Sequence, residues 1–134
     1  MSVSFAAKNI KFSDMGFLDE FDGKKTLEVY SLGTPVFRLS FDDYVCFDSG
    51  CILKQEFVDK YIAKGLYGNI MNDVLAKKRL SLDGATYVQN GDGFSQRATD
   101  GENYDINYEV KNKSVEFVER MHGFRFLIRF VDGG

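Results

Sequence analysis

Apolar and polar residues alternate through the first third of the chain, a period-two pattern that is typical of β-strands with one buried face. The alternating apolar residues are Val3, Phe5 and Ala7, then Leu27 and Val29, then Phe37, Leu39 and Phe41. Asp22-Gly23 and the segment 32–35, which holds the single proline, predict turns between these strands. Residues 1–47 are therefore predicted to be β-rich, ending in a short buried strand over residues 44–47.

The period changes at Leu53, where apolar residues begin to recur at the three- and four-residue spacing of a helix face. Two such stripes are separated by Gly65, and they are Leu53, Phe57, Val58, Tyr61 and Ile62, then Tyr67, Ile70, Met71, Val74 and Leu75. The basic triplet 77–79 follows the second stripe, where positive charge favours a helix C-terminus. Residues 52–79 are therefore predicted to form a helical hairpin with Gly65 as a C-cap.

A period of two returns after Leu82, with turn dipeptides at regular intervals. These dipeptides are Asp83-Gly84, Asn90-Gly91, Asp92-Gly93 and Asp100-Gly101, and they tolerate the positive φ angles of tight hairpins. Apolar faces are predicted for Tyr104, Ile106, Tyr108 and Val110, and for Phe124, Phe126, Ile128 and Phe130 opposite Arg125 and Arg129. Residues 83–132 are thus predicted to form a β-meander. The whole chain, 1–134, is predicted to be a single α+β domain, an antiparallel, curled β-sheet with a two-helix insertion packed on its concave face.

The composition narrows the function classes more than it identifies one. The chain has 134 residues, 44% of them hydrophobic, with a formal net charge of -3 and both signs mixed along the sequence. This charge pattern gives no basic surface for nucleic acid, so we expect no nucleic-acid partner. No apolar run reaches the roughly 18 residues needed to span a bilayer. The first residues lack a basic segment followed by an apolar one, so no signal peptide is expected in this chain.

The two cysteines, Cys46 and Cys51, are the strongest candidate for chemistry in the sequence. The predicted structure places Cys46 near the end of a strand and Cys51 at the start of the first helix, with 48–50 as a tight connection that can bring both thiols within bridging distance. A structural disulfide is one interpretation, worth about 2 kcal/mol for so short a loop, and it implies an oxidising compartment. Two buried free thiols and a reactive thiol at a helix N-terminus are the alternatives, although the Cys-x-x-Cys redox spacing is missing.

Other motifs give weaker indications. His122 is the only histidine, and nothing in the spacing brings it to the cysteines to form a nucleophile pair or a zinc site. The segment 90–102 is rich in Asp and Gly but fails the EF-hand pattern, because Phe94 occupies a ligand position. No phosphate-binding loop, dinucleotide fingerprint, nucleophile elbow or zinc-protease motif is present. We predict no catalytic residue, no metal site and no cofactor.

The aromatic content offers one binding hypothesis. The chain holds 13 Phe and 7 Tyr without any Trp, and a curled sheet lined by such rings can enclose an apolar ligand. The alternative is that the helices fill this space as ordinary core.

The composition and the Cys-x4-Cys turn resemble the mature domains of small secreted or lipid-anchored envelope proteins of Gram-negative bacteria. That resemblance implies a non-catalytic accessory or binding module in the periplasm or elsewhere outside the cytoplasm, without assigning any residue a role. Three functions follow as hypotheses: a binding or accessory domain with an unknown protein partner, a carrier for an apolar small molecule or lipid in a Phe/Tyr-lined cavity, and a cysteine-dependent redox or hydrolytic enzyme.

Overall fold

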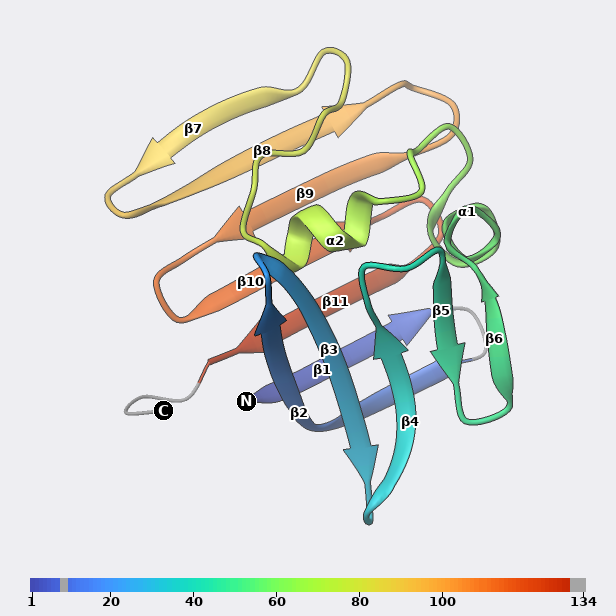
Figure 1. The fold of residues 1–134 in the computed structure, drawn as a ribbon. Helices are drawn as coiled ribbons and strands as arrows, with labels where there is room; N and C mark the ends of the chain where they lie inside the picture. Colours follow the sequence, from blue (N-terminus) through green and yellow to red (C-terminus); the bar gives the residue numbers. More distant parts are fainter. Residues whose placement is uncertain (8–9, 131–134) are drawn as a thin grey trace.

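The protein is described by a computed structural model that covers residues 1–7 and 10–130 (Figure 1). An 11-stranded antiparallel sheet dominates the described residues, in the order β6-β5-β4-β3-β2-β1-β11-β10-β9-β8-β7. The sheet does not close into a barrel, so β6 and β7 are its two edges. The antiparallel sheet predicted from the alternating pattern is confirmed.

The strands are mostly short, and the helical segments lie between the sixth and seventh of them. The strands are β1 (Ser2–Ala7), β2 (Ile10–Phe21), β3 (Lys24–Ser31), β4 (Thr34–Leu39), β5 (Tyr44–Phe47), β6 (Gly50–Leu53), β7 (Thr86–Asn90), β8 (Gly93–Thr99), β9 (Asp105–Val110), β10 (Ser114–Glu119) and β11 (Phe124–Arg129). The helical segments are α1 (Lys54–Phe57), the π-helical turn η1 (Val58–Ile62) and α2 (Ile70–Leu75).

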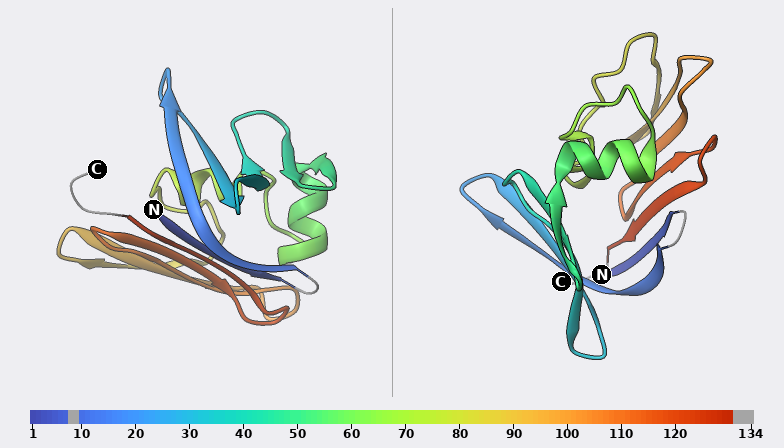
Figure 2. Two further views of the ribbon diagram at one scale, coloured as in Figure 1. Left: turned by 90° about the horizontal axis from the view of Figure 1, so that it is seen from below. Right: turned by 90° about the vertical axis from the view of Figure 1, so that its right-hand side faces the viewer.

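Strand β2 joins two halves of the sheet. Its first part, from Ile10 to Met15, pairs with β1, and its second part, from Met15 to Phe21, pairs with β3. We call β1 and β7–β11 the main half and β3–β6 the side half. Figure 2 shows the β2–β3 ribbon rising away from the layer formed by β9–β11. Gly16 lies at this transition, where an added Cβ would be 2.7 Å from Cγ2 of Val3, so the close approach of β1 and β2 requires glycine.

The core lies between the two halves. In the main half, every second residue of β1, β9, β10 and β11 is buried, as period-two patterning requires. Helix α2 contacts β3 of the side half and β10 of the main half. Its buried residues, Ile70, Met71, Val74 and Leu75, belong to the same hydrophobic cluster as the strands. The helical stripe predicted at these four positions therefore marks core residues.

The predicted helical hairpin over residues 52–79 is wrong in its bounds, and the structure does not support its packing as a hairpin. Ile52 and Leu53 complete β6, and α2 ends at Leu75. The main contacts of α1 are with β5 and β6, whereas those of α2 are with β3 and β10. The connection over residues 63–69 is irregular, and the side-chain amide of Gln55 donates to the carbonyl of Leu66 within it. Apart from the adjoining η1, the main packing partners of both helices are therefore strands.

Two further sequence predictions, for Phe41 and for the basic triplet 77–79, differ from the structure. Phe41 does not share the buried face of Phe37 and Leu39, because β4 ends at Leu39 and Phe41 is 56% exposed. The basic triplet lies beyond α2, and Lys77 has a φ of 57° that ends the helix.

No helix in residues 1–7 and 10–130 is both long and apolar enough to cross a membrane.

Candidate functional site

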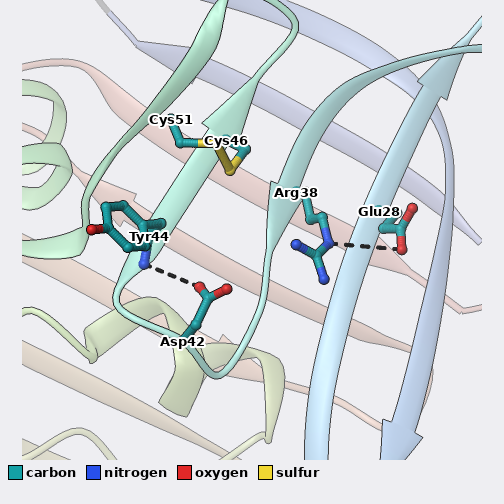
Figure 3. Close-up of a disulfide and its surroundings, with 6 residues drawn as sticks. All are labelled: Glu28, Arg38, Asp42, Tyr44, Cys46 and Cys51. Carbon is teal, nitrogen blue, oxygen red and sulfur yellow. Dashed lines mark hydrogen bonds and ion pairs between the residues drawn. A yellow bond between two sulfur atoms is a disulfide. The ribbon is translucent and has the colours of Figure 1, made fainter.

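The candidate site is built on the hairpin of β5 and β6. The strand register pairs Cys46 with Cys51 and Phe47 with Gly50. The two Sγ atoms lie 2.07 Å apart, at the distance of a disulfide bond (Figure 3). Cys51 therefore lies in a strand, and its predicted place at the start of the first helix is wrong, because the chain stays extended through Leu53.

The two faces of this hairpin differ. Residues paired directly across antiparallel strands share a face, and neighbours along a strand point to opposite faces. The disulfide therefore lies on the same face as Arg38, which is the register partner of Cys46. Nε of Arg38 is 3.9 Å from the carboxylate of Glu28 (Figure 3). Phe47 lies on the other face, where its register partner in β4 is Phe37. If the register of β5 slipped by one residue, Phe47 would point to the opposite face of the sheet. The disulfide across β5 and β6 therefore fixes the face on which Phe47 lies.

Phe47 borders an open pocket of about 450 Å³, which we call the aromatic groove. Five of its lining residues are partly buried apolar side chains that pack against the core cluster, namely Ile10, Phe12, Val36, Phe47 and Tyr61. Its polar lining residues are Lys11, Asp14, Ser31, Asp48 and Ser49. The groove thus lies where the start of β2, the end of β3, the bulged part of β4, the β5–β6 turn and η1 meet.

The rings of the groove continue the aromatic core. Phe12 stacks on the fully buried Phe5, with centroids 5.0 Å apart and planes at 2°. Phe47 lies 5.6 Å from the buried Phe37 and 5.9 Å from Tyr61. Because each groove ring is supported from behind by a buried ring or by its neighbour, the apolar wall is preformed.

Two backbone features leave the groove open. The register between β3 and β4 shifts at Val29 and Tyr30, whose partners are Phe37 and Pro35, so Val36 is the extra residue of a β-bulge. Bulges commonly redirect a side chain, and Val36 lines the groove. Gly50, opposite Phe47, places no side chain over the ring, and a Cβ added there would meet nothing within 4 Å.

Charge around the groove is uneven. Asp14 pairs with Val3 on the inner face of β2, two residues from Phe12 and on the same side. Asp48 follows Phe47 at the turn. Lys11 points the other way, since its register partner is Ala6, and it also borders a second pocket with Arg125. The face that carries the aromatic rings therefore also carries carboxylate.

Comparison with family models, with curated proteins and with solved structures found no match for this chain. The groove therefore has to be interpreted from its own residues.

His122 contacts a carboxylate rather than the cysteines considered for it in the sequence. It sits in the turn between β10 and β11, with Nδ1 3.1 Å from a carboxylate oxygen of the fully buried Glu119. That carboxylate also accepts the backbone N–H groups of Met121 and His122. These bonds stabilise the turn. The small cleft that His122 borders contains no cysteine among its lining residues, so the structure does not assemble a cysteine–histidine pair there.

The acidic segments are explained by turn geometry. Asp100 accepts backbone N–H groups from Glu102, Asn103 and Tyr104, and the bond from Asn103 contributes most to lowering the Asp100 pKa to about 2. Asp42 accepts the N–H of Tyr44 in the same manner. Within the described residues, no group of three or more His, Cys, Asp or Glu side chains is gathered to hold a metal ion.

A buried lysine lies at the far end of the same hairpin. Lys54 is 6% exposed at the start of α1, and its backbone N–H donates to the carbonyl of Asp43. Burial lowers the pKa of its ammonium group, and the nearby carboxylates of Asp42 and Asp43 partly oppose that shift. Its place next to these acidic residues indicates a role in holding the turn that leads into β5.

Sequence reasoning missed most of the groove. Phe12, Phe47 and Tyr61 follow the same periodicity as the core residues, so nothing in the pattern distinguishes a ring at an opening from one that is covered. Val36 lines the groove because of a β-bulge, and no residue type in the sequence predicts that bulge. Gly50 was a usable signal, because a glycine opposite an aromatic ring leaves that ring uncovered.

Proposed function

We propose that this protein is a non-enzymatic binding domain that works outside the cytoplasm and holds an apolar, ring-sized group in the aromatic groove. One observation carries the proposal: Phe12, Phe47 and Tyr61 are supported by the core on one side and border an open pocket on the other. The pocket volume of about 450 Å³ falls within the roughly 300–1,000 Å³ of small-molecule sites. We propose further that the helices occupy the concave side of the bent sheet and leave the groove as its uncovered part.

The cysteine pair supports the proposed location. A disulfide persists in oxidising compartments and is rare in the cytoplasm, and the sulfur atoms of Cys46 and Cys51 lie at bonding distance. A place in the bacterial cell envelope, as the sequence resemblance implies, agrees with this and stays a prediction. A thiol count in the unfolded protein tests the bond: zero free thiols without reductant and two with it are expected.

A binding role agrees better with the geometry than a cysteine-dependent enzyme does. Sulfur atoms joined to each other are not available as nucleophiles. They also lie on the face of the hairpin opposite Phe47 and the groove. We therefore place the function in the groove and give the disulfide a supporting role.

Titration with N-phenyl-1-naphthylamine, a neutral apolar dye that fluoresces when bound, tests the proposal. We expect saturable fluorescence in the natural protein. Ser31→Phe places a large side chain in the groove lining and should weaken dye binding at least fivefold. Leu32→Phe is the matched control, because Leu32 is fully exposed at the next position, and it should bind normally. Absence of saturable binding, or equal binding by both variants, would contradict the proposal.

A further inference from the structure

We infer that the aromatic groove selects an organic cation, an alkyl or aryl ammonium group with an apolar body. This inference rests on the proposed binding function and names its ligand class.

The charged lining favours a cation. Two carboxylates, Asp14 and Asp48, border the groove together with one ammonium group, that of Lys11. Lys11 belongs to the opposite face of β2, so its charge is directed toward the surface it shares with Arg125. Asp14, by contrast, is on the face of Phe12. A positively charged group in the groove would therefore gain attraction from both carboxylates, whereas an anion would be repelled.

The walls favour a cation for a separate reason. The faces of aromatic rings are electron-rich and attract ammonium groups placed within about 6 Å of the ring centre. At Tyr61 the protein itself supplies such a cation, because Nζ of Lys60 lies 5.3 Å from its ring centroid, so this ring is already partly occupied. Phe12 and Phe47 offer two more rings to the same space. Several rings and a carboxylate around one cavity are the chemistry that recognises quaternary ammonium groups.

Several carboxylates of the sheet have an arginine partner. Glu116 pairs with Arg125 at 2.6 Å, Glu28 with Arg38 at 3.9 Å, and Asp105 with Arg97 at 3.7 Å. Within residues 1–7 and 10–130, no such partner is found for Asp14 or Asp48. Among the described residues, their charge is therefore not engaged in an ion pair.

Three probes of similar size and different charge test the inference by NMR titration of the ¹⁵N-labelled protein. They are benzyltrimethylammonium, benzyl alcohol and benzenesulfonate. We expect benzyltrimethylammonium to bind five- to tenfold more tightly than benzyl alcohol, with benzenesulfonate weakest, and with shifts centred on the amides of the groove. Added salt should reduce the preference for the cation without changing the binding of benzyl alcohol.

Charge-neutralising variants separate this inference from the proposed function. Asp14→Asn and Asp48→Asn together should remove most of the preference for the cation and leave benzyl alcohol unchanged. Asp19→Asn, on the other face of β2, is the control and should change neither. Lys11→Gln should raise the preference. If benzyl alcohol binds in the groove as well as the cation does, the inference is wrong and the proposed function stands. If no probe binds there, both are wrong.

Discussion

The two edges of the sheet are both hairpins, and they are stabilised in different ways. The β5–β6 hairpin has four residues in each strand and a disulfide across its middle. The β7–β8 hairpin is longer, with five and seven residues, and has side-chain hydrogen bonds and an aromatic pair instead. The amide of Gln89, for example, donates to the carbonyls of Gly91 and Gly93 across the turn. The shorter edge thus has fewer paired residues, and the disulfide adds a covalent link where the ladder is short.

The glycines that begin the return strands show the same contrast. A Cβ on Gly93 would lie 2.0 Å from the carbonyl oxygen of Val110, in the next strand of the sheet. A Cβ on Gly50 would meet nothing. One edge is therefore packed against its neighbour through the backbone, while the other is left open beside a ligand-sized groove.

The largest effect is expected from Gly93→Ala. The added methyl group collides with backbone rather than with a movable side chain, so β8 must shift away from β9. We expect a loss of about 3 kcal/mol or more in the free energy of unfolding. Gly50→Ala, at a φ of 142° with open space around it, should cost only backbone strain of about 1–2 kcal/mol. Urea denaturation of both variants measures the difference, and equal costs would show that the two edges are packed alike.

The disulfide should have the next largest effect. Replacing both Cys46 and Cys51 with Ser should lower the free energy of unfolding by about 2 kcal/mol, because the unfolded chain regains the freedom of the short loop. The same variant should lose dye binding by more than this stability loss explains, since Phe47 is no longer held on the groove side. Reductant should lower the free energy of unfolding of the natural protein and leave that of the double variant unchanged. Normal dye binding by the double variant would show that the hairpin register does not depend on the bond.

A smaller effect is expected at the other edge. The guanidinium carbon of Arg79 lies 3.8 Å from the ring centroid of Tyr87 in β7. Arg79→Ala should cost about 0.5–1 kcal/mol, a typical value for an exposed cation–aromatic contact. Arg79→Lys keeps the charge but loses the planar stack. Its free energy of unfolding should lie between those of the natural protein and Arg79→Ala. Urea midpoints of the three proteins measure this, and an unchanged midpoint for Arg79→Ala would show that the contact does not support the edge.

The smallest effect is expected from Asp100, at the far end of β8, because it is exposed and solvent screens its interactions. Backbone N–H groups, above all that of Asn103, lower the pKa of Asp100 to about 2, from an ordinary value of about 3.9. A lowered pKa in the folded state contributes stability above the ordinary value, and that contribution is lost as the pH falls from about 4 toward 2. Thermal denaturation between pH 2 and 5 should therefore show a steeper loss in the natural protein than in Asp100→Asn. Parallel curves would contradict this assignment.

Several strands could be predicted from the sequence because their apolar residues recur at every second position. Val3 and Phe5, or Phe124 and Phe126, lie in strands with one buried face, and their alternation is directly visible. Strand β2 was harder, because Met15 and Phe17 are exposed on one face while Phe12 packs on the other, so apolar residues occur on both sides. The helical pattern predicted the buried residues Ile70, Met71, Val74 and Leu75 correctly. It did not predict that α2 contacts β3 and β10, since periodicity identifies a face and does not identify what covers it.

The groove depends on features that are not local. Cys46 and Cys51 were recognisable as a pair, although not as partners across two strands. The meeting of Phe12, Phe47 and Tyr61 depends on a register, a bulge and an approach between segments up to about 50 residues apart in the chain. No window of sequence contains that information.

The pairing of β1 with β11 has a consequence for how the molecule folds. Ser2 stands opposite Arg129, and Phe5 stands opposite Phe126, so neighbouring strands in the middle of the sheet come from opposite ends of the described chain. During synthesis, β1 can pair with β2 at once, but its other edge stays bare until β11 has left the ribosome. Contacts so distant in sequence slow folding, since a long loop must close before they form. We therefore expect folding in milliseconds to seconds rather than microseconds, with the centre of the sheet completed late.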